Sequence, residues 1–358
     1  MPHKDVKRLR IGVLGCGPIA QAAHFDACTK ARNVDLYAIC DVADDLRLRI
    51  QATYAPAASY ADFETMLHDP QLDAVIIATS DSFHVDAARL ALKAGKHVLC
   101  EKPLGVSVEE VEELNALAEL SGRVLQVGHM KRFDAGIQSA RAFIANDMGA
   151  LLAYKGWYCD STHRYAVTDA VQPVIIRSAN ARRPATDAKA DLRRYYMLAH
   201  GSHLVDTARF LVGPIDAVDA KLAERFGAYC WFVTVHFANG TLGHLDLSVA
   251  VRMDWHEGFQ IYGENGSVLG KTWNPWLFKS SDVDIFREAD GAWHRTLGAD
   301  GHFYRRQLES FASVILDGAA MTGANALDGV ASVRAMVAIA QSVESGRTIR
   351  LAEVTGPV

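Results

Sequence analysis

The amino-terminal third of the chain alternates short apolar runs with amphipathic stretches. The apolar runs are typical of buried strands and cover residues 9–14, 34–40, 73–78, 97–100 and 124–128. The stretches between them have helical spacing, and glycines such as Gly95 and Gly122 fit helix ends. Strands that alternate with helices predict right-handed βαβ units and a parallel sheet. We therefore predict an α/β domain over residues 1–128.

The rest of the chain, residues 129–358, has a different pattern. Strand-like runs cover residues 151–160, 226–237, 241–251, 259–262 and 267–270. Asn239-Gly240 and Glu264-Asn265-Gly266 lie between consecutive runs and are typical of hairpin turns. Helices are predicted over residues 134–146, 303–316 and 327–344. The hairpins predict antiparallel pairing in this second domain.

Composition narrows the class of protein. A chain of 358 residues suffices for two domains with separate cores, and its 50% hydrophobic and 22% charged residues are ordinary for a globular protein. The net charge of −5 favours neither nucleic acid nor an anionic membrane as a partner. No apolar stretch reaches the roughly 18 residues that span a bilayer, and the polar residues 1–10 do not resemble a signal peptide. We expect a cytoplasmic protein with no membrane or nucleic-acid partner.

The six cysteines are scattered and form no Cys-x-x-Cys pair. They are Cys16, Cys28, Cys40, Cys100, Cys159 and Cys230. Several lie in predicted strands, so we expect reduced thiols in the core of a cytosolic protein. The same scatter argues against structural zinc, and we expect no metal.

A glycine-rich turn joins the first predicted strand to the first helix. Gly15, Gly17 and Ala20 match the pattern G-x-G-x-x-A. The first glycine allows a tight turn, the second allows a pyrophosphate to approach the backbone, and the alanine lets the helix pack near the strand. Pro18 and Ile19 lie where the helix begins, and phosphates bind at such helix N-termini. These residues predict a dinucleotide site in a Rossmann-type domain.

Asp41 directly follows the second predicted strand. A carboxylate at that strand end accepts hydrogen bonds from both hydroxyls of a ribose and repels a 2′-phosphate. The residue therefore points to NAD rather than NADP as the cofactor. The alternative is a local role, in which Asp41 caps a helix that starts near Asp44.

The apolar run 97–100 ends at Glu101-Lys102-Pro103. Proline cannot continue a sheet ladder, and it biases the preceding residue toward an extended conformation. Lys102 is therefore expected at the carboxyl end of a parallel strand, where ligands bind in open α/β sheets. The alternative is a lysine in a surface turn, since lysines are mostly exposed.

Several stretches together resemble the glucose–fructose oxidoreductase/inositol dehydrogenase (Gfo/Idh/MocA) family. They are residues 15–20, Asp41, residues 79–84, 94–103 and 126–133. The resemblance covers essentially the whole chain, and the run Ala-Gly-Lys-His-Val-Leu-Cys-Glu-Lys-Pro is its most specific part. It implies a Rossmann domain followed, over residues 129–358, by an α+β domain with a large open, mostly antiparallel sheet. It also implies a homo-dimer or homo-tetramer.

The same resemblance implies an NAD(P)-dependent oxidoreductase. Such an enzyme transfers hydride between nicotinamide and a sugar, cyclitol or related polyol, or its keto form. Lys102 is then the active-site lysine, also in contact with the cofactor, and Glu101 fixes the nicotinamide region. Thr79, Ser80 and His84 are then further cofactor contacts.

A group of polar residues lies where another helix is predicted to begin. His200, His203 and Asp206 recur at i, i+3 and i+6, so they can share one helical face. The residues alone leave three interpretations, namely a metal site, a helix cap with core packing, and a site of proton transfer. The resemblance favours the third, because the family commonly has an Asp-x-x-x-His pair here. His203 matches the histidine, and Ala199 occupies the aspartate position.

We therefore predict His203 as a general base that acts with Lys102. His200 or Asp206 are the candidates to replace the missing carboxylate, unless the proton relay is shorter than in the family.

Polar and aromatic side chains of the second domain are candidates to line a substrate site. They are His129, Tyr154, Trp157, Asp160, Arg164, Tyr165 and His200. Aromatic faces suit the C–H side of a sugar, while carboxylates and guanidinium groups hydrogen-bond its hydroxyls. Six arginines also lie within residues 162–194, where they can bind hydroxyls or an acidic substrate, or can belong to a solvated loop or an oligomer contact.

Two other functions remain compatible with the sequence. One is a redox-neutral enzyme, such as a glycosidase or epimerase, that uses a tightly held NAD transiently. The other is an NAD-binding regulatory protein, a class that the alanine at position 199 favours. Neither would produce net NADH from an alcohol, which separates both from a dehydrogenase.

Overall fold

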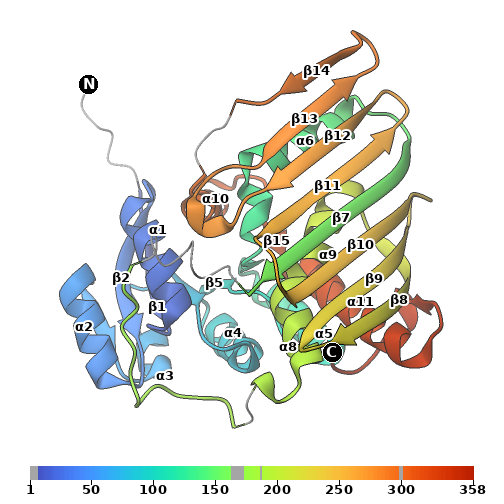
Figure 1. Ribbon diagram of the computed structural model, residues 1–358. Coiled ribbons are helices and arrows are strands. Elements are labelled where there is room, and N and C mark those ends of the chain that lie inside the picture. The colour runs from blue at the N-terminus through green and yellow to red at the C-terminus, as the bar shows by residue number, and fades with distance from the viewer. Residues whose placement is uncertain (1–6, 163–172, 186–187, 298–300) are drawn as a thin grey trace. The chain divides into compact units, whose positions relative to one another are not determined.

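The computed structural model describes residues 7–162, 173–185, 188–297 and 301–358 (Figure 1). The chain divides into two compact units. The first contains Met1–Met130, Gln172–Ala188 and Tyr304–Val330. The second contains Lys131–Val171, Lys189–Phe303 and Ala331–Val358. The sequence analysis proposed one boundary, between residues 128 and 129, and did not foresee that two later segments belong to the first unit.

Within its described residues, the first unit is built on a seven-stranded sheet of order β15-β6-β5-β4-β1-β2-β3. Six of these strands run parallel, namely β1 Leu9–Leu14, β2 Val34–Cys40, β3 Ala58–Tyr60, β4 Ala74–Ile77, β5 His97–Cys100 and β6 Leu125–Val127. The edge strand β15 (Ala324–Asn325) pairs antiparallel with β6. β4 is buried along its whole length, as expected for a parallel sheet that is covered on both faces. The predicted parallel α/β domain is confirmed.

Five helices of the first unit follow its strands, as the sequence predicts. They are α1 Phe25–Lys30, α2 Asp44–Tyr54, α3 Phe63–Leu67, α4 His84–Lys93 and α5 Val108–Ser121. A π-helical turn, η1 (Ala20–His24), precedes α1, and a 3-10 turn, η2 (Asp81–Phe83), precedes α4. The Ser107 hydroxyl caps α5 by accepting a hydrogen bond from the backbone N–H of Glu110. Gly122 ends the same helix with a φ of 61°.

The described part of the second unit is built on a nine-stranded sheet of order β14-β13-β12-β11-β7-β10-β9-β8-β16. The strands are β7 Leu151–Ser161, β8 Ile215–Arg225, β9 Ala228–Phe237, β10 Leu242–Val251, β11 His256–Gly263, β12 Gly266–Thr272, β13 Asp282–Arg287, β14 Ala292–Arg295 and β16 Ile349–Arg350. β7 and β10 run parallel, and the other neighbouring pairs run antiparallel. The mostly antiparallel sheet that the family resemblance implies is confirmed.

Both predicted hairpins are confirmed. β9 turns into β10 at Asn239-Gly240, where Gly240 has a φ of 84° and the Asn239 side chain accepts a hydrogen bond from the N–H of Thr241. β11 turns into β12 through Glu264-Asn265. The sequence analysis did not predict β8, β13, β14 and β16. These strands carry exposed polar residues over much of their length, so their apolar pattern is weak.

Helices pack on the sheet of the second unit. α6 (Ala135–Asn146) contacts β12 and β13, and α9 (Ser202–Val212) contacts β7 and β10 (Figure 1). A 3-10 turn, η3 (Met130–Phe133), precedes α6, and α8 (Leu192–Tyr196) leads through a π-helical turn, η5 (Met197–Gly201), into α9. The Asp134 carboxylate caps α6 by accepting hydrogen bonds from two backbone N–H groups of its first turn.

α10 (Phe303–Asp317) and α11 (Ala326–Ser345) are the last two long helices. Among the described residues, α11 alone has the length and apolar composition of a membrane-crossing helix. However, 61% of its most apolar stretch is buried, and a buried helix in the core of a protein can have the same length and composition. Its Ser342 hydroxyl accepts a hydrogen bond from the backbone N–H of Ala220 on β8.

The six cysteines are all free thiols. Five are buried and Cys230 is partly exposed. The prediction of unpaired thiols, several of them in strands of the core, is confirmed.

Candidate active site

The glycine-rich turn leaves the carboxyl end of β1 with little space around its first glycine. Gly15 has a φ of 91°, and a Cβ there would lie 2.9 Å from the carbonyl oxygen of Ala78, just past the end of β4. Gly17, in contrast, faces open space, with no atom within 4 Å of the position of a Cβ. The helix begins directly afterwards, at Pro18. The turn is therefore tight against the sheet and open on the side from which a phosphate can reach the backbone.

Asp41 stands at the end of β2 and holds this turn in place. One carboxylate oxygen accepts a hydrogen bond from the N–H of Cys16 at 2.8 Å, and the other accepts from the N–H of Ala43 at 2.9 Å. The second bond lies just before α2, but the N-cap of that helix is Ala43 and no side chain caps it, so the alternative of Asp41 as a helix cap is not what the structure shows. A carboxylate has about four lone-pair positions, so two backbone bonds leave capacity for ribose hydroxyls.

His84 ties together the two loops that follow β4 and β5. Its Nδ1 lies 2.7 Å from the carbonyl oxygen of Pro103, and its Nε2 lies 3.2 Å from that of Thr79. The ring is buried, whereas Ser80 next to Thr79 is exposed. These contacts give His84 a role in positioning the loops. Thr79 and Ser80 are accessible at the same edge of the sheet.

Lys102 follows β5 at this edge, and its peptide bond to Pro103 is cis. Beside it, the Glu101 carboxylate lies 2.9 Å from Nε2 of His24 and accepts a hydrogen bond from the Lys102 N–H at 3.1 Å. Burial raises the pKa of Glu101, but the hydrogen bond and charge of His24, together with the charge of Lys102, outweigh burial and hold that pKa below its ordinary value. Glu101 is therefore a buried carboxylate that fixes the backbone of Lys102.

These residues fit a dinucleotide. The tight first glycine, the open second glycine and the helix start at Pro18 form a cradle for a pyrophosphate, and Asp41 lies at the strand end where a ribose binds. The carboxyl edge of the parallel sheet therefore has the features of a dinucleotide site, and Lys102 lies at the same edge, two strands away from β1.

In the second unit, β7 and η5 bring three polar side chains together. The Tyr158 hydroxyl lies 3.2 Å from Nδ1 of His200, and Nε2 of His200 lies 3.2 Å from the Asp160 carboxylate. The His203 ring is nearly parallel to that of Tyr158, at 6.1 Å between ring centres. Tyr158 and Asp160 are two residues apart on β7, so they point to the same face of the sheet.

A buried ion pair lies against the same tyrosine. Lys131 pairs with Glu257, and its ammonium lies 4.6 Å from the centre of the Tyr158 ring. Burial lowers the pKa of Lys131 and raises that of Glu257, because it penalises the charged form of each and their mutual attraction offsets this only in part. We call these six residues, Tyr158, Asp160, His200, His203, Lys131 and Glu257, the Tyr158 cluster.

Asp206 is engaged elsewhere. Its carboxylate accepts hydrogen bonds from the Arg132 guanidinium at 2.7, 3.0 and 3.2 Å, and both side chains are buried. His200 and Asp206 were the two candidates to stand in for the carboxylate absent at Ala199. Of these, His200 is the one that the structure places beside a carboxylate, that of Asp160.

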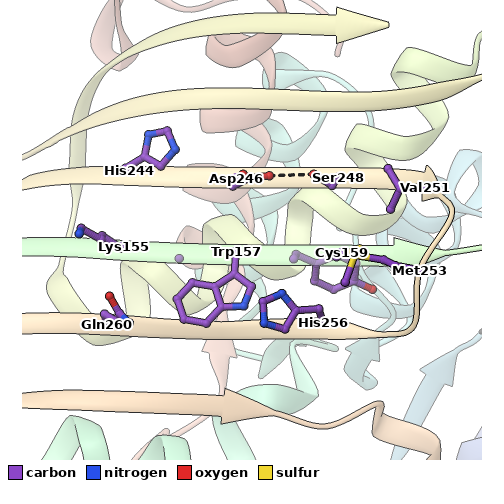
Figure 2. A pocket seen from close by; sticks show the side chains of 12 residues that line it. Lys155, Trp157, Cys159, His244, Asp246, Ser248, Val251, Met253, His256 and Gln260 are labelled. Carbon is purple, nitrogen blue, oxygen red and sulfur yellow. Dashed lines mark hydrogen bonds between the residues drawn. The ribbon is translucent and has the colours of Figure 1, made fainter. Parts of the chain in front are cut away.

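The predicted substrate residues do not lie together in one site. Tyr154 is buried in the core, edge-on to Phe237. Trp157 lies on the face of β7 opposite to Tyr158, where it stacks on His256 and lines a pocket of β7, β10 and β11 (Figure 2). A shift of one residue along a strand changes the face, which explains why neighbouring candidates do not meet.

Three predicted substrate residues remain. Arg164 and Tyr165 lie outside the described residues. His129 is buried and lies two residues after the end of β6.

The sequence analysis missed Tyr158, Lys131, Arg132 and Glu257. The signal for Tyr158 was available, because it stands two residues from Asp160 on a predicted strand. The two ion pairs join residues 126 and 74 positions apart and leave no local signal. In the described part of the chain, no group of three or more histidine, cysteine, aspartate and glutamate side chains is placed to hold a metal ion.

Known proteins resemble this chain in both units. Residues 9–129 match a family described as oxidoreductase, NAD-binding Rossmann fold, and residues 196–351 match the C-terminal α/β domain of the same Gfo/Idh/MocA family. Inositol 2-dehydrogenase of Rubrobacter xylanophilus is 26% identical over 355 residues, which cover 96% of this chain and 93% of that protein.

One further relative is similar in sequence over part of the chain, and another is similar in fold over nearly all of it. The 1-carboxy-3-chloro-3,4-dihydroxycyclohexa-1,5-diene dehydrogenase of Comamonas testosteroni is 39% identical over 246 residues, 67% of this chain and 58% of that protein. The solved structure of a levoglucosan dehydrogenase in complex with NADH and levoglucosan matches with a TM-score of 0.80 at 19% identity, over 97% of this chain and 100% of that one, and so shares the fold. Because both domain matches lie in their expected order, the chain belongs to the Gfo/Idh/MocA family of NAD-binding oxidoreductases.

Proposed function

We propose that this oxidoreductase transfers hydride between NAD and a secondary alcohol carbon of a polyhydroxylated ring, or the corresponding ketone. The position of Lys102 carries the proposal. It follows β5 at the edge where the glycine-rich turn and Asp41 form the dinucleotide cradle, and the buried Glu101–His24 pair fixes its backbone. A cation at this edge suits an alcohol oxygen that becomes more negative as its proton leaves.

Bound NAD supplies the acceptor for the hydride. Lys102 donates a hydrogen bond to the substrate oxygen and stabilises the negative charge that develops as the O–H bond breaks. His203 takes the proton, since imidazole suits a general base near neutral pH. In the direction of reduction, the same residues return the proton to the ketone oxygen.

Asp160 supplies the carboxylate that the chain lacks at Ala199. It faces Nε2 of His200 at 3.2 Å, so it favours the tautomer in which that nitrogen carries the proton. Nδ1 of His200 is then free of a proton on the side of Tyr158, whose hydroxyl lies 3.2 Å away. The pair thus puts a negative charge and a polarised imidazole at the helix start that carries His203. Asp206 suits this role less well, because Arg132 neutralises it.

The substrate class follows from the relatives and from the residues. Inositol, levoglucosan and the dihydroxycyclohexadiene of the relatives' names are all rings with hydroxyl groups. The Comamonas relative is named for a ring that carries a carboxylate beside its hydroxyl groups. We therefore favour a hydroxylated six-membered ring, with a carboxylated cyclic diol as the first compound to test.

Asp41 supports NAD over NADP, because a 2′-phosphate would meet its carboxylate. Six free thiols, five of them buried, support a reducing compartment such as the cytoplasm. A homo-oligomer is supported by apolar side chains on the second unit's sheet, such as Phe232, which is 45% exposed.

The test is a screen at 340 nm. Inositols, anhydrosugars and carboxylated cyclic diols are offered with NAD and, separately, with NADP, and NADH formation is followed. We expect net NADH with at least one ring polyol. His203→Ala should lower kcat by about 10²-fold or more with little change in KM, and Asp160→Asn should shift the pH profile of kcat. Product from a ring substrate without net NADH would replace this proposal by the redox-neutral alternative, and NAD binding without any turnover would favour a regulatory protein.

A further inference from the structure

A segment distant in sequence from the dinucleotide edge runs across it. Residues 173–185, which we call the crossing segment, belong to the first unit although they lie between β7 and α8 in the chain. In Figure 1 this segment is the yellow-green trace drawn across β2 and down toward α3. It has no regular secondary structure, and it contacts the helical turns that follow β1, β2 and β4.

The first contact is to the helix that follows the glycine-rich turn. The Gln21 side chain is buried, and its amide nitrogen donates hydrogen bonds to the carbonyl oxygens of Cys16, at 2.8 Å, and Ile176, at 2.9 Å. Its amide oxygen accepts a hydrogen bond from the N–H of Ile176 at 2.8 Å. One side chain thus binds both the glycine-rich turn and the backbone of the crossing segment.

The second contact is to the first turn of α2, just beyond Asp41. The Ser178 hydroxyl donates a hydrogen bond to the Asp45 carboxylate at 2.7 Å. It also accepts one from the N–H of Asn180 at 2.9 Å. The hydrogen bond from Ser178 is the largest of the causes that hold the pKa of Asp45 below its ordinary value.

The third contact is to the loop after β4. The Arg182 guanidinium lies over the ring of Phe83, at 4.6 Å from its centre. In the sheet, β2 and β4 flank β1 on its two sides. The Ser178 and Arg182 contacts therefore lie on opposite sides of the glycine-rich turn, and Ile176 is bound next to that turn.

We propose that the crossing segment completes the cofactor site of this chain by covering its adenosine end, so that NAD leaves only after the segment has moved. The end is assigned from Asp41, which marks the ribose next to the adenine and lies four residues from Asp45. Arg177 and Arg182 give the segment positive charge toward an anionic pyrophosphate. The proposal rests on NAD binding alone and is independent of the substrate and of hydride transfer.

Limited trypsin digestion reports the cover directly, because the segment contains three arginines. We expect NAD and ADP-ribose to slow cleavage after Arg177 and Arg182 by about tenfold or more, whereas the bond after Arg183 precedes Pro184 and is not cut by trypsin. Nicotinamide mononucleotide, which lacks the adenosine half, should not. Cleavage after Arg252, which is exposed in the second unit, is the control for general stabilisation. Equal cleavage of the segment with and without ADP-ribose would overturn the proposal.

A double variant tests the contacts. Ser178→Ala with Arg182→Ala removes the bonds to Asp45 and Phe83 and leaves Gln21, Asp41 and Lys102 intact. We expect the Kd for NAD to rise about tenfold, mostly through faster dissociation, measured by displacement of bound NADH in a stopped-flow fluorimeter. The matched control is Arg183→Ala, an exposed arginine of the same segment. An unchanged dissociation rate in the double variant, with the melting temperature of the NAD-free protein preserved, contradicts the proposal.

Discussion

The dinucleotide edge of the first unit and the Tyr158 cluster of the second unit are held together by different forces. At the edge, backbone geometry and hydrogen bonds to backbone groups position Gly15, Asp41 and Glu101, each within a few residues of a strand end. In the Tyr158 cluster and the neighbouring Arg132–Asp206 pair, side chains from four separate stretches meet through buried ion pairs.

The two kinds of site should therefore respond differently to substitution. Buried ion pairs are costly to leave half-complete, because the remaining charge has lost its water. Backbone-held residues are replaced with less damage to the fold, so their loss is expected to affect binding or chemistry more than stability. The predictions that follow set one kind of site against the other.

The largest effect on stability is expected for Asp206→Ala in the second unit. It leaves the Arg132 guanidinium buried without its carboxylate, which costs about 3–5 kcal/mol of unfolding free energy. Urea denaturation followed by circular dichroism measures the loss. The control is Asp216→Ala, an exposed aspartate on β8, which should change stability by less than about 0.5 kcal/mol. A cost below about 1 kcal/mol for Asp206→Ala would remove the contrast drawn above.

Lys102→Ala should have the opposite profile. We expect kcat to fall by about 10²–10³-fold on the substrate found in the screen, with NAD affinity and unfolding free energy nearly unchanged. Steady-state kinetics, NAD titration and urea denaturation separate these quantities. Lys93→Ala, at an exposed lysine near the end of α4, is the control. If kcat stayed within tenfold of the original enzyme, Lys102 would not be the active-site lysine.

His24→Leu tests the same effect at the dinucleotide edge, because it removes one partner of the buried His24–Glu101 pair. The unpaired Glu101 carboxylate should cost about 2–3 kcal/mol at pH 7. In the original protein the pKa of Glu101 is lowered, so its ionisation stabilises the fold above about pH 4.3, and this stability is lost as pH falls through the folded pKa.

In the variant, burial without the histidine favours the neutral acid. The stability gap between the two proteins should therefore narrow as pH falls from 7 toward about 4.3, as measured by urea denaturation at several pH values. Adding Glu101→Gln to His24→Leu should remove most of the cost at pH 7. A gap independent of pH would mean that the loss comes from packing against Tyr304 and not from the carboxylate.

The smallest effect is expected for Asp41→Ala, and it concerns specificity. Removing the carboxylate should lower the preference for NAD over NADP by about 10- to 100-fold, because a hydrogen-bonded charged group contributes about 1.5–3 kcal/mol. The ratio of kcat/KM for the two cofactors measures it. Asp35→Ala, on the same strand, should leave the ratio unchanged. A higher efficiency with NADP in the original enzyme would refute the role of Asp41.

Much of the fold could be predicted from local pattern. The apolar runs of β1, β2, β4 and β5 and the two hairpin turns were all visible in the sequence. β15 was not visible, because a two-residue strand has no periodicity and its partner β6 lies about 200 positions earlier. The crossing segment was read only as an arginine-rich stretch, since nothing local shows which residues it contacts.

The candidate site divides in the same way. Gly15, Gly17, Asp41 and Lys102 were found because each stands at the end of an apolar run, and the carboxyl ends of parallel strands share one edge. Trp157 and Asp160 were both predicted to line the substrate site and lie on opposite faces of β7, while Tyr158 was not among the candidates.

Local pattern in the sequence was enough to predict the parallel sheet, the glycine-rich turn and the place of Lys102 at the carboxyl end of a strand. The reason is that strand periodicity, glycine conformation and the carboxyl-edge rule act over a few residues. Tertiary structure alone decided that Asp160 faces His200, that Arg132 engages Asp206, and that residues 173–185 return to the first unit. These contacts depend on sheet register and on the meeting of distant segments, which the local pattern does not encode. For Lys102, the sequence found the group, and the fold supplied the buried Glu101–His24 pair that holds it.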